Sequence, residues 1–165
     1  MGVSAENSAK KDAPTLIAGG YPFGIKLLME GVMVTDTAKV DNISSPAEDA
    51  GIKKGDVITS ANGTPLTSNN GLSRIIAESR GKSVTLELLR EGNPLTVELS
   101  PVFSEKDKIW RSGMWVRDSI AGIGTMTFAV KDTGEFSGLG HPVCDCDTGE
   151  LIPLHSGEAV PVKIT

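Results

Sequence analysis

The stretch "AGIKKGDVITSANGTPL", residues 50–66, decides the fold of this chain. Gly51 can adopt the positive φ that ends a helix, and Ser45-Pro46 supplies a matching start signal a few residues earlier. The residues "DVITSA" have strand composition and run into Asn62-Gly63, a dipeptide typical of tight two-residue turns. The stretch therefore predicts a short helix, a sharp stop and a strand in close succession.

The neighbouring segments extend this pattern in both directions. Residues 31–40, "GVMVTDTAKV", alternate as a strand does. Residues 68–81, "SNNGLSRIIAESRG", carry apolar side chains at helical spacing and stop at a glycine. Residues 83–100, "SVTLELLREGNPLTVELS", form two alternating runs around a turn. We expect one compact α+β unit over residues 14–102.

This order of elements resembles a PDZ domain of the bacterial protease-associated type. The segment "GGYPFGIKL", residues 19–27, falls where such domains carry their carboxylate-binding loop. The resemblance implies that an extended peptide, either a protein C-terminus or an internal segment, binds beside this loop. The backbone chemistry agrees, because Phe23-Gly24-Ile25 can aim successive N–H groups into one anion-binding concavity.

The predicted peptide groove has a strand side and a helix side. On the strand side a free sheet edge would accept the peptide as an added strand, and on the helix side apolar residues would wall its last side chain. The alternative is that the apolar residues are ordinary core and that the groove is filled or occluded. The candidate peptide-binding residues are Phe23, Gly24, Ile25, Lys26, Leu27, Leu72 and Ile76.

The chain changes character after this unit. Residues 103–110, "FSEKDKIW", are charged and predict a linker, whereas residues 111–165 are glycine-rich with short alternating runs, among them "AVPVKIT" at 159–165. This second part is too short to close a β-domain and is interpreted as an incomplete barrel. Residues 1–13 are polar and predict a disordered arm. The fold class expected for the whole chain is α+β, mainly β.

A second resemblance rests on two motifs. Residues 122–128, "GIGTMTF", and residues 138–148, "GLGHPVCDCDT", resemble the stage IV sporulation protein B family of serine peptidases. The sequence departs from the family pattern at Ser137, Cys144 and Cys146. The resemblance implies a chymotrypsin-like barrel and a regulatory peptidase of endospore formation, which signals from forespore to mother cell and leads to activation of a late sigma factor.

The resemblance assigns His141 the role of catalytic general base and places its aspartate and serine partners beyond Thr165. We therefore expect these 165 residues to be catalytically inactive by themselves. Local substitutes are poor. In a straight strand Asp145 would lie about 13 Å along the chain from His141, unless the chain turns at Pro142. Ser156 lacks the glycine-flanked context of a strained nucleophile turn.

A metal site is the competing interpretation of the same residues. His141, Cys144, Cys146 and perhaps His155 would be the ligands, but C-x-C is shorter than the spacing typical of zinc sites. We expect no metal and no cofactor, and a zinc hydrolase is the third choice of enzyme class. The two thiols are predicted to be buried and inert, since a disulfide across one intervening strand residue fits poorly. His155 is expected at the surface of a loop.

Composition and charge limit the partners. Net charge is −5 with the acids dispersed, which excludes the clustered basic face of a nucleic-acid-binding protein. The expected partners are an extended peptide and a protein substrate, with self-association through exposed sheet edges.

An export signal is expected upstream, which would place the protein outside the cytoplasm, between forespore and mother cell membranes. The alternative function is a PDZ adaptor without catalysis. Trp110 and Trp115 are predicted to pack at the seam between the two parts.

Overall fold

The computed structural model describes residues 13–146, 149 and 151–163, and it is mainly β. Its helices are α1 (Pro46–Asp49) and α2 (Asn69–Glu78). Its strands are β1 (Leu16–Ala18), β2 (Pro22–Thr37), β3 (Val57–Ala61), β4 (Thr64–Pro65), β5 (Val84–Arg90), β6 (Asn93–Leu99), β7 (Val102–Ser104), β8 (Ile109–Arg111), β9 (Met114–Val130), β10 (Phe136–Gly138) and β11 (Leu154–Val160). The predicted class, α+β and mainly β, is confirmed.

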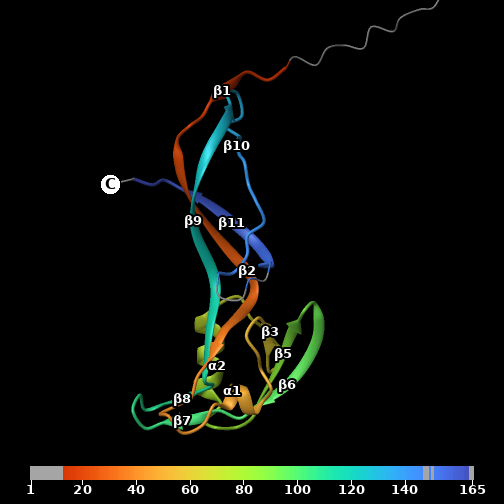
Figure 1. The fold of residues 1–165 in the computed structure, drawn as a ribbon, viewed down its shortest axis with the longest axis vertical. Helices are drawn as coiled ribbons and strands as arrows, with labels where there is room; N and C mark the ends of the chain where they lie inside the picture. Colours follow the sequence, from red (N-terminus) through yellow and green to blue (C-terminus); the bar gives the residue numbers. More distant parts are fainter. Residues whose placement is uncertain (1–12, 147–148, 150, 164–165) are drawn as a thin grey trace, which may run out of the picture.

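One sheet joins both parts of the sequence. Its main order is β1-β9-β2-β3-β5-β6, with β10 added to β9, β11 added to β2 and β4 added to β3. Two long strands, β2 and β9, run antiparallel along most of their lengths. Figure 1 shows them leaving the compact end that holds α1 and α2 and extending to β1 and β10 at the far end. The sheet therefore has a packed half and an extended half.

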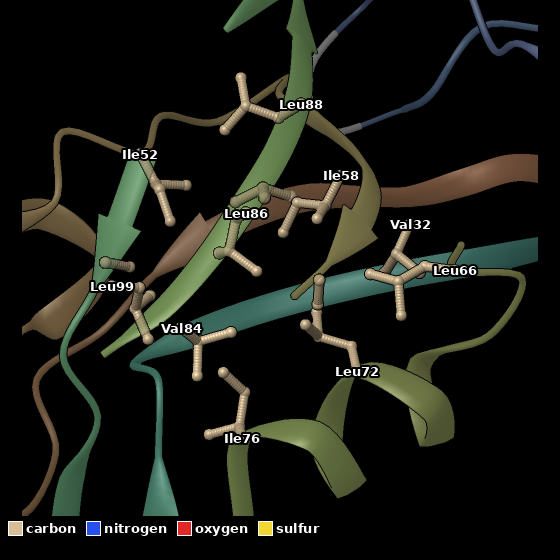
Figure 2. Packing of buried hydrophobic residues seen from close by; sticks show 13 residues of the cluster. Val32, Ile52, Ile58, Leu66, Leu72, Ile76, Val84, Leu86, Leu88 and Leu99 are labelled. Atoms are coloured by element: carbon tan, nitrogen blue, oxygen red, sulfur yellow. The ribbon is translucent and has the colours of Figure 1, made fainter. Parts of the chain in front are cut away.

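The packed half contains the main hydrophobic core (Figure 2). Helix α2 contributes Leu72 and Ile76, which are 2% and 3% exposed, and they face β5 and the second half of β2. Full burial of such a side chain contributes about 1.5–3 kcal/mol. Met114 and Val116 from the start of β9 pack against the same cluster, so the second part of the chain helps to complete this core.

The turn chemistry of residues 45–63 is confirmed. Gly51 has a φ of 76° directly after α1, and Asn62 and Gly63 both have positive φ, at 48° and 72°. Ser68 caps α2, because its Oγ accepts a hydrogen bond from the Gly71 backbone N–H at 3.1 Å. Ser45 stands at the N-cap of α1, but its buried hydroxyl makes no capping hydrogen bond.

The predicted linker, residues 103–110, forms most of a small hairpin, since β7 and β8 pair with each other. Trp110 lies edge-on to Phe103 with ring centroids 5.4 Å apart, and its ring covers Gly81 after α2. The expectation that Trp115 is packed is wrong: this side chain is 65% exposed. Successive strand residues point to opposite faces, so Met114 and Val116 face the core and Trp115 faces away.

The C-terminal strand lies earlier than expected. It is β11, which covers residues 154–160 and pairs with the first half of β2. Of the expected strand 159–165, residues 161–163 are outside any strand and residues 164–165 lie outside the described residues. His155 is therefore on a strand rather than a loop, although its side chain is exposed as expected. The predicted arm lies almost wholly outside the described residues. The domain boundaries and the chymotrypsin-like barrel stay predictions.

Candidate functional site

His141 lies on the exposed loop that follows β10. Its ring Nδ1 is 2.8 Å from the Pro142 carbonyl oxygen. The ring borders an open depression of about 650 Å³, whose wall includes residues 123–127 of β9, at the centre of the G-x-G-T-x-T motif. The structure thus brings together the two motifs that carry the peptidase resemblance, with a histidine accessible to a substrate.

The local candidates for the other catalytic roles lie elsewhere. Asp145 is 1% exposed, and its carboxylate accepts a hydrogen bond from the Arg117 guanidinium. Ser156 lies within β11, opposite Leu28 of β2. Among the described residues, the His141 ring bonds to its neighbour's carbonyl and to no carboxylate or hydroxyl. Neither Asp145 nor Ser156 is arranged to form a triad with His141.

The expectation of buried thiols is wrong, because Cys144 and Cys146 are both free and exposed. Between them Asp145 is buried and its carboxylate pairs with Arg117, so the inward position in this segment belongs to the aspartate and not to either thiol. The backbones of Cys144 and Leu151 form an isolated antiparallel β-bridge, and the Cys146 Sγ is 3.8 Å from the Arg117 Nη1. Within residues 13–146, 149 and 151–163, no three histidine, cysteine or acidic side chains gather as a metal site would require.

The strand side of the predicted peptide groove differs from the expectation. Residues 23–27 lie in the first half of β2, where β9 pairs along one edge and β11 along the other. The expected free edge is absent there. The expected concavity at Phe23-Gly24-Ile25 is absent too, because all three residues are extended strand; a Cβ on Gly24 would lie 2.7 Å from the Val160 side chain. The second part of the chain supplies both covering strands.

The helix side is present but faces another strand. Beside α2 lies the start of β9, and the Asp118 Oδ2 accepts a hydrogen bond from the Asn69 backbone N–H at 2.7 Å. An open groove of about 930 Å³ runs along α2; its lining includes Leu72, Ile76 and residues 114–116. Leu72 and Ile76 therefore combine with β9, not with residues 23–27. Binding at any of these residues stays a prediction.

Sequence reasoning missed the role of residues 114–118. Their alternation over "MWVRD" was a signal of a strand, but their partner strand lies some eighty positions earlier in the chain. Arg117 and Asp118 stand next to each other in the sequence and bond in opposite directions, to Asp145 and to α2. Adjacent opposite charges in a strand are a weak signal by themselves, since most such residues face solvent.

Comparison with known families agrees with the two motifs and with the element order. Residues 108–165 match the family described as SpoIVB peptidase S55, and residues 1–100 match the PDZ domain family. The PDZ match covers more than half of the chain, so the chain belongs to the PDZ domain family. The rest of the chain, from residue 108 on, is similar to part of the S55 serine peptidase domain.

Curated relatives match a shorter part of the chain. The periplasmic pH-dependent serine endoprotease DegQ of Escherichia coli K12 is 54% identical over 52 residues, which is 31% of this chain and 11% of DegQ. The putative zinc metalloprotease NMA0084 of Neisseria meningitidis is 32% identical over 108 residues, 61% of this chain and 24% of that protein. The chain thus spans less than a quarter of either relative. Their names cover both serine and zinc proteases.

Among solved structures, the PDZ domain of the SdrC-like protein from Listeria monocytogenes is similar. It has 22% sequence identity and a TM-score of 0.45, and the match covers 53% of this chain and 87% of that domain.

Proposed function

We propose that the protein to which this chain belongs is a regulatory serine endopeptidase of endospore formation, with His141 as its general base. The observation that carries the proposal is the exposed His141 ring at the depression bordered by residues 123–127. An accessible imidazole can take a proton from a serine hydroxyl and return it to the leaving amine. Gly140 beside it has open space around its Cα, which leaves room for a substrate backbone, whereas Gly124 lies against the Phe23 ring.

The nucleophile and the orienting carboxylate come from outside these 165 residues in this proposal. Asp145 is engaged by Arg117, and Ser156 sits in the middle of a paired strand. An imidazole without its nucleophile has nothing to activate, and removing a triad member removes most of the acceleration. The 165-residue chain is then catalytically inactive by itself.

The biological setting of the proposal rests on the similarity of residues 108–165 to the S55 peptidase domain. The peptidase acts outside the cytoplasm, between forespore and mother cell membranes, on a protein substrate that controls activation of a late sigma factor. The PDZ domain gates the peptidase or recruits its substrate, and the ligand of the PDZ domain is an extended peptide. The groove along α2 supports this part, because it combines an apolar helix face with an adjacent strand. Within the described residues, no helix is long and apolar enough to cross a bilayer.

The alternative is a peptide-binding adaptor without catalysis. It is favoured by the same groove and by the lack of a carboxylate or hydroxyl bonded to His141 among the described residues. The two proposals differ in one measurable property: only the peptidase needs the His141 imidazole.

A serine-reactive fluorophosphonate probe separates the two proposals. We expect no labelling of the 165-residue chain, and labelling of one serine in the longer parent protein that is lost in His141→Ala. His155→Ala is the matched control, because it removes the other exposed histidine and should keep the labelling. Labelling of the parent that survives His141→Ala, or of Ser156 in the short chain, would refute the assignment of the base. A parent that is never labelled supports the adaptor.

A further inference from the structure

Three consecutive residues of β9 make contacts in different parts of the molecule. Val116 packs against the core cluster that contains Leu72 and Ile76 of α2. Asp118 accepts the Asn69 backbone N–H at the start of α2, at 2.7 Å. Arg117, between them, pairs with Asp145 in the segment that follows His141. Residues 116–118 thus touch both the helix of the peptide groove and the histidine loop.

Strand geometry explains how one short segment reaches both places. Val116 lies opposite Val34 of β2, and both belong to the core beneath α2. Arg117 lies opposite Met33, whose side chain belongs to a second cluster on the other face of the sheet. Val143, which precedes Asp145, and Ile152, which follows it by seven residues, pack in that second cluster. Side chains of neighbouring strand residues point to opposite faces, so Val116 faces the cluster beneath α2 and Arg117 faces the second cluster.

The Arg117–Asp145 pair is the buried polar anchor of the histidine loop. The Asp145 side chain is fully buried, whereas Arg117 is 32% exposed. Residues 139–142 are themselves exposed. Removing one partner of a buried ion pair is costly, because the remaining charge stays in a poorly hydrated site. The position of residues 139–146 on the sheet is therefore sensitive to Arg117.

We propose that Arg117 is a positioning residue, which holds the loop that carries His141 in register with β9 and couples it to α2. The proposal rests on the proposed function insofar as His141 is the general base. A displacement at the start of α2, as when a peptide enters the adjoining groove, acts on Asp118 and reaches Asp145 through the neighbouring Arg117. This is one physical route by which the PDZ domain could gate the peptidase.

The first test uses the 165-residue chain and does not depend on catalysis. Chemical shifts of residues 139–146 and amide hydrogen exchange of Gly149 and Ile152 are compared in the wild type, Arg117→Ala, Arg117→Lys and Asp118→Ala. These two N–H groups donate to the Asp145 and Val143 carbonyls at 2.8 and 3.0 Å, so their exchange reports on the loop. We expect Arg117→Ala to speed this loop exchange by at least about tenfold, the equivalent of one lost ion-pair contribution. Arg117→Lys should restore part of the protection, since lysine keeps the charge but not the forked geometry. Asp118→Ala should shift both the first turn of α2 and the loop.

The matched control is Arg111→Ala, which breaks an exposed arginine–aspartate pair with Asp107 at 2.9 Å. It should leave residues 139–146 unchanged. Loop exchange in Arg117→Ala that equals the wild type, with the core amides intact, would overturn the proposal. If Arg117→Ala does not fold, Arg117→Lys and Asp118→Ala decide: unchanged loop shifts in both overturn the proposal as well.

The second test uses the longer parent protein with a peptide substrate. Arg117→Lys should lower kcat and alter its pH profile while KM stays close to the wild-type value, because the base is misplaced and substrate binding is intact. A parallel loss of kcat and gain in KM without a change in the pH profile contradicts the positioning role. Retained activity of His141→Ala would contradict the proposed function alone, because the exchange result on the short chain does not involve catalysis.

Discussion

The ion pair between Arg90 and Asp56 should be the most costly polar contact to break in the packed half. The Arg90 Nε and Nη2 donate to the two carboxylate oxygens at 2.8 Å each, and the Lys53 backbone N–H donates to the same carboxylate at 2.8 Å. The Arg90 Nη2 also donates to the Gly51 carbonyl at 2.7 Å, so the pair ties β5 to the turn after α1. The hydrogen bonds to Asp56 raise the pKa of the Arg90 guanidinium above its usual range.

The magnitude follows from burial. The Asp56 side chain is 1% exposed and the Arg90 side chain is 28% exposed. Arg90→Ala leaves a buried carboxylate with one backbone donor, and losing one partner of a buried pair costs about 3–5 kcal/mol. Asp56→Ala leaves a guanidinium that water can reach, so we expect a smaller loss, about 2–3 kcal/mol, set by its hydrogen bonds. Both are large fractions of a domain's total stability of about 5–15 kcal/mol.

Urea unfolding followed by far-ultraviolet circular dichroism and by the combined fluorescence of Trp110 and Trp115 measures these losses. The control is Arg111→Ala, whose exposed pair with Asp107 should contribute no more than about 1 kcal/mol. The double variant Arg90→Ala/Asp56→Ala should lose less than the sum of the single losses, since the partners share one interaction. Equal losses for Arg90→Ala and Arg111→Ala, or strict additivity in the double variant, would refute the reasoning.

Two further predictions concern the surroundings of α2 and the β7–β8 hairpin. Gly81→Ala should destabilise the fold by at least about 1 kcal/mol, because its φ is +84° and the new Cβ would lie 2.4 Å from the Trp110 ring. Thermal unfolding checks this, and Trp110 fluorescence does so in a Trp115→Phe background. Gly92→Ala, at φ +77° in open space, is the control for backbone strain alone. For Asp41, burial acts to raise the pKa, but hydrogen bonds from the Ser104 hydroxyl and from two backbone N–H groups lower it overall. Its carboxylate therefore stabilises the fold above the unfolded pKa of about 3.9, and this stabilisation is lost as pH falls through the lower folded value. The melting-temperature difference between the wild type and Asp41→Asn should be largest near neutral pH and shrink in acid; a constant difference contradicts it.

Local signals in the sequence were enough to predict the packed half. Gly51, Asn62-Gly63 and the cap at Ser68 each act over a few residues, and the structure has the corresponding turns and helix start. The apolar spacing of Leu72 and Ile76 correctly predicted one buried face of α2. Each of these features follows from backbone conformation or helical period, which a single segment determines alone.

The edges of β2 could not be predicted in the same way. Residues 23–27 have strand composition, but whether an edge is free depends on which distant segments pair with it, here β9 and β11. The exposed thiols have a related cause. Cys144 and Cys146 are small apolar residues by type, but both are exposed. The residue buried between them is Asp145, which pairs with the distant Arg117. Pairing over long sequence separations leaves no local signal.

Strand β9 connects the core beneath α2 with the depression at His141. Its first residues complete that core, and its later residues, 123–127, border the depression. Strand β2 pairs with residues 114–125 of β9, but the ladder has register shifts between Leu28 and Met33 and between Val34 and Asp36. Such irregularities bend a strand locally, so β9 and β2 do not move as one straight rigid pair. In our proposal a shift at the start of α2 therefore reaches the histidine loop through the side-chain contacts of Asp118 and Arg117, and removing either contact should interrupt the coupling.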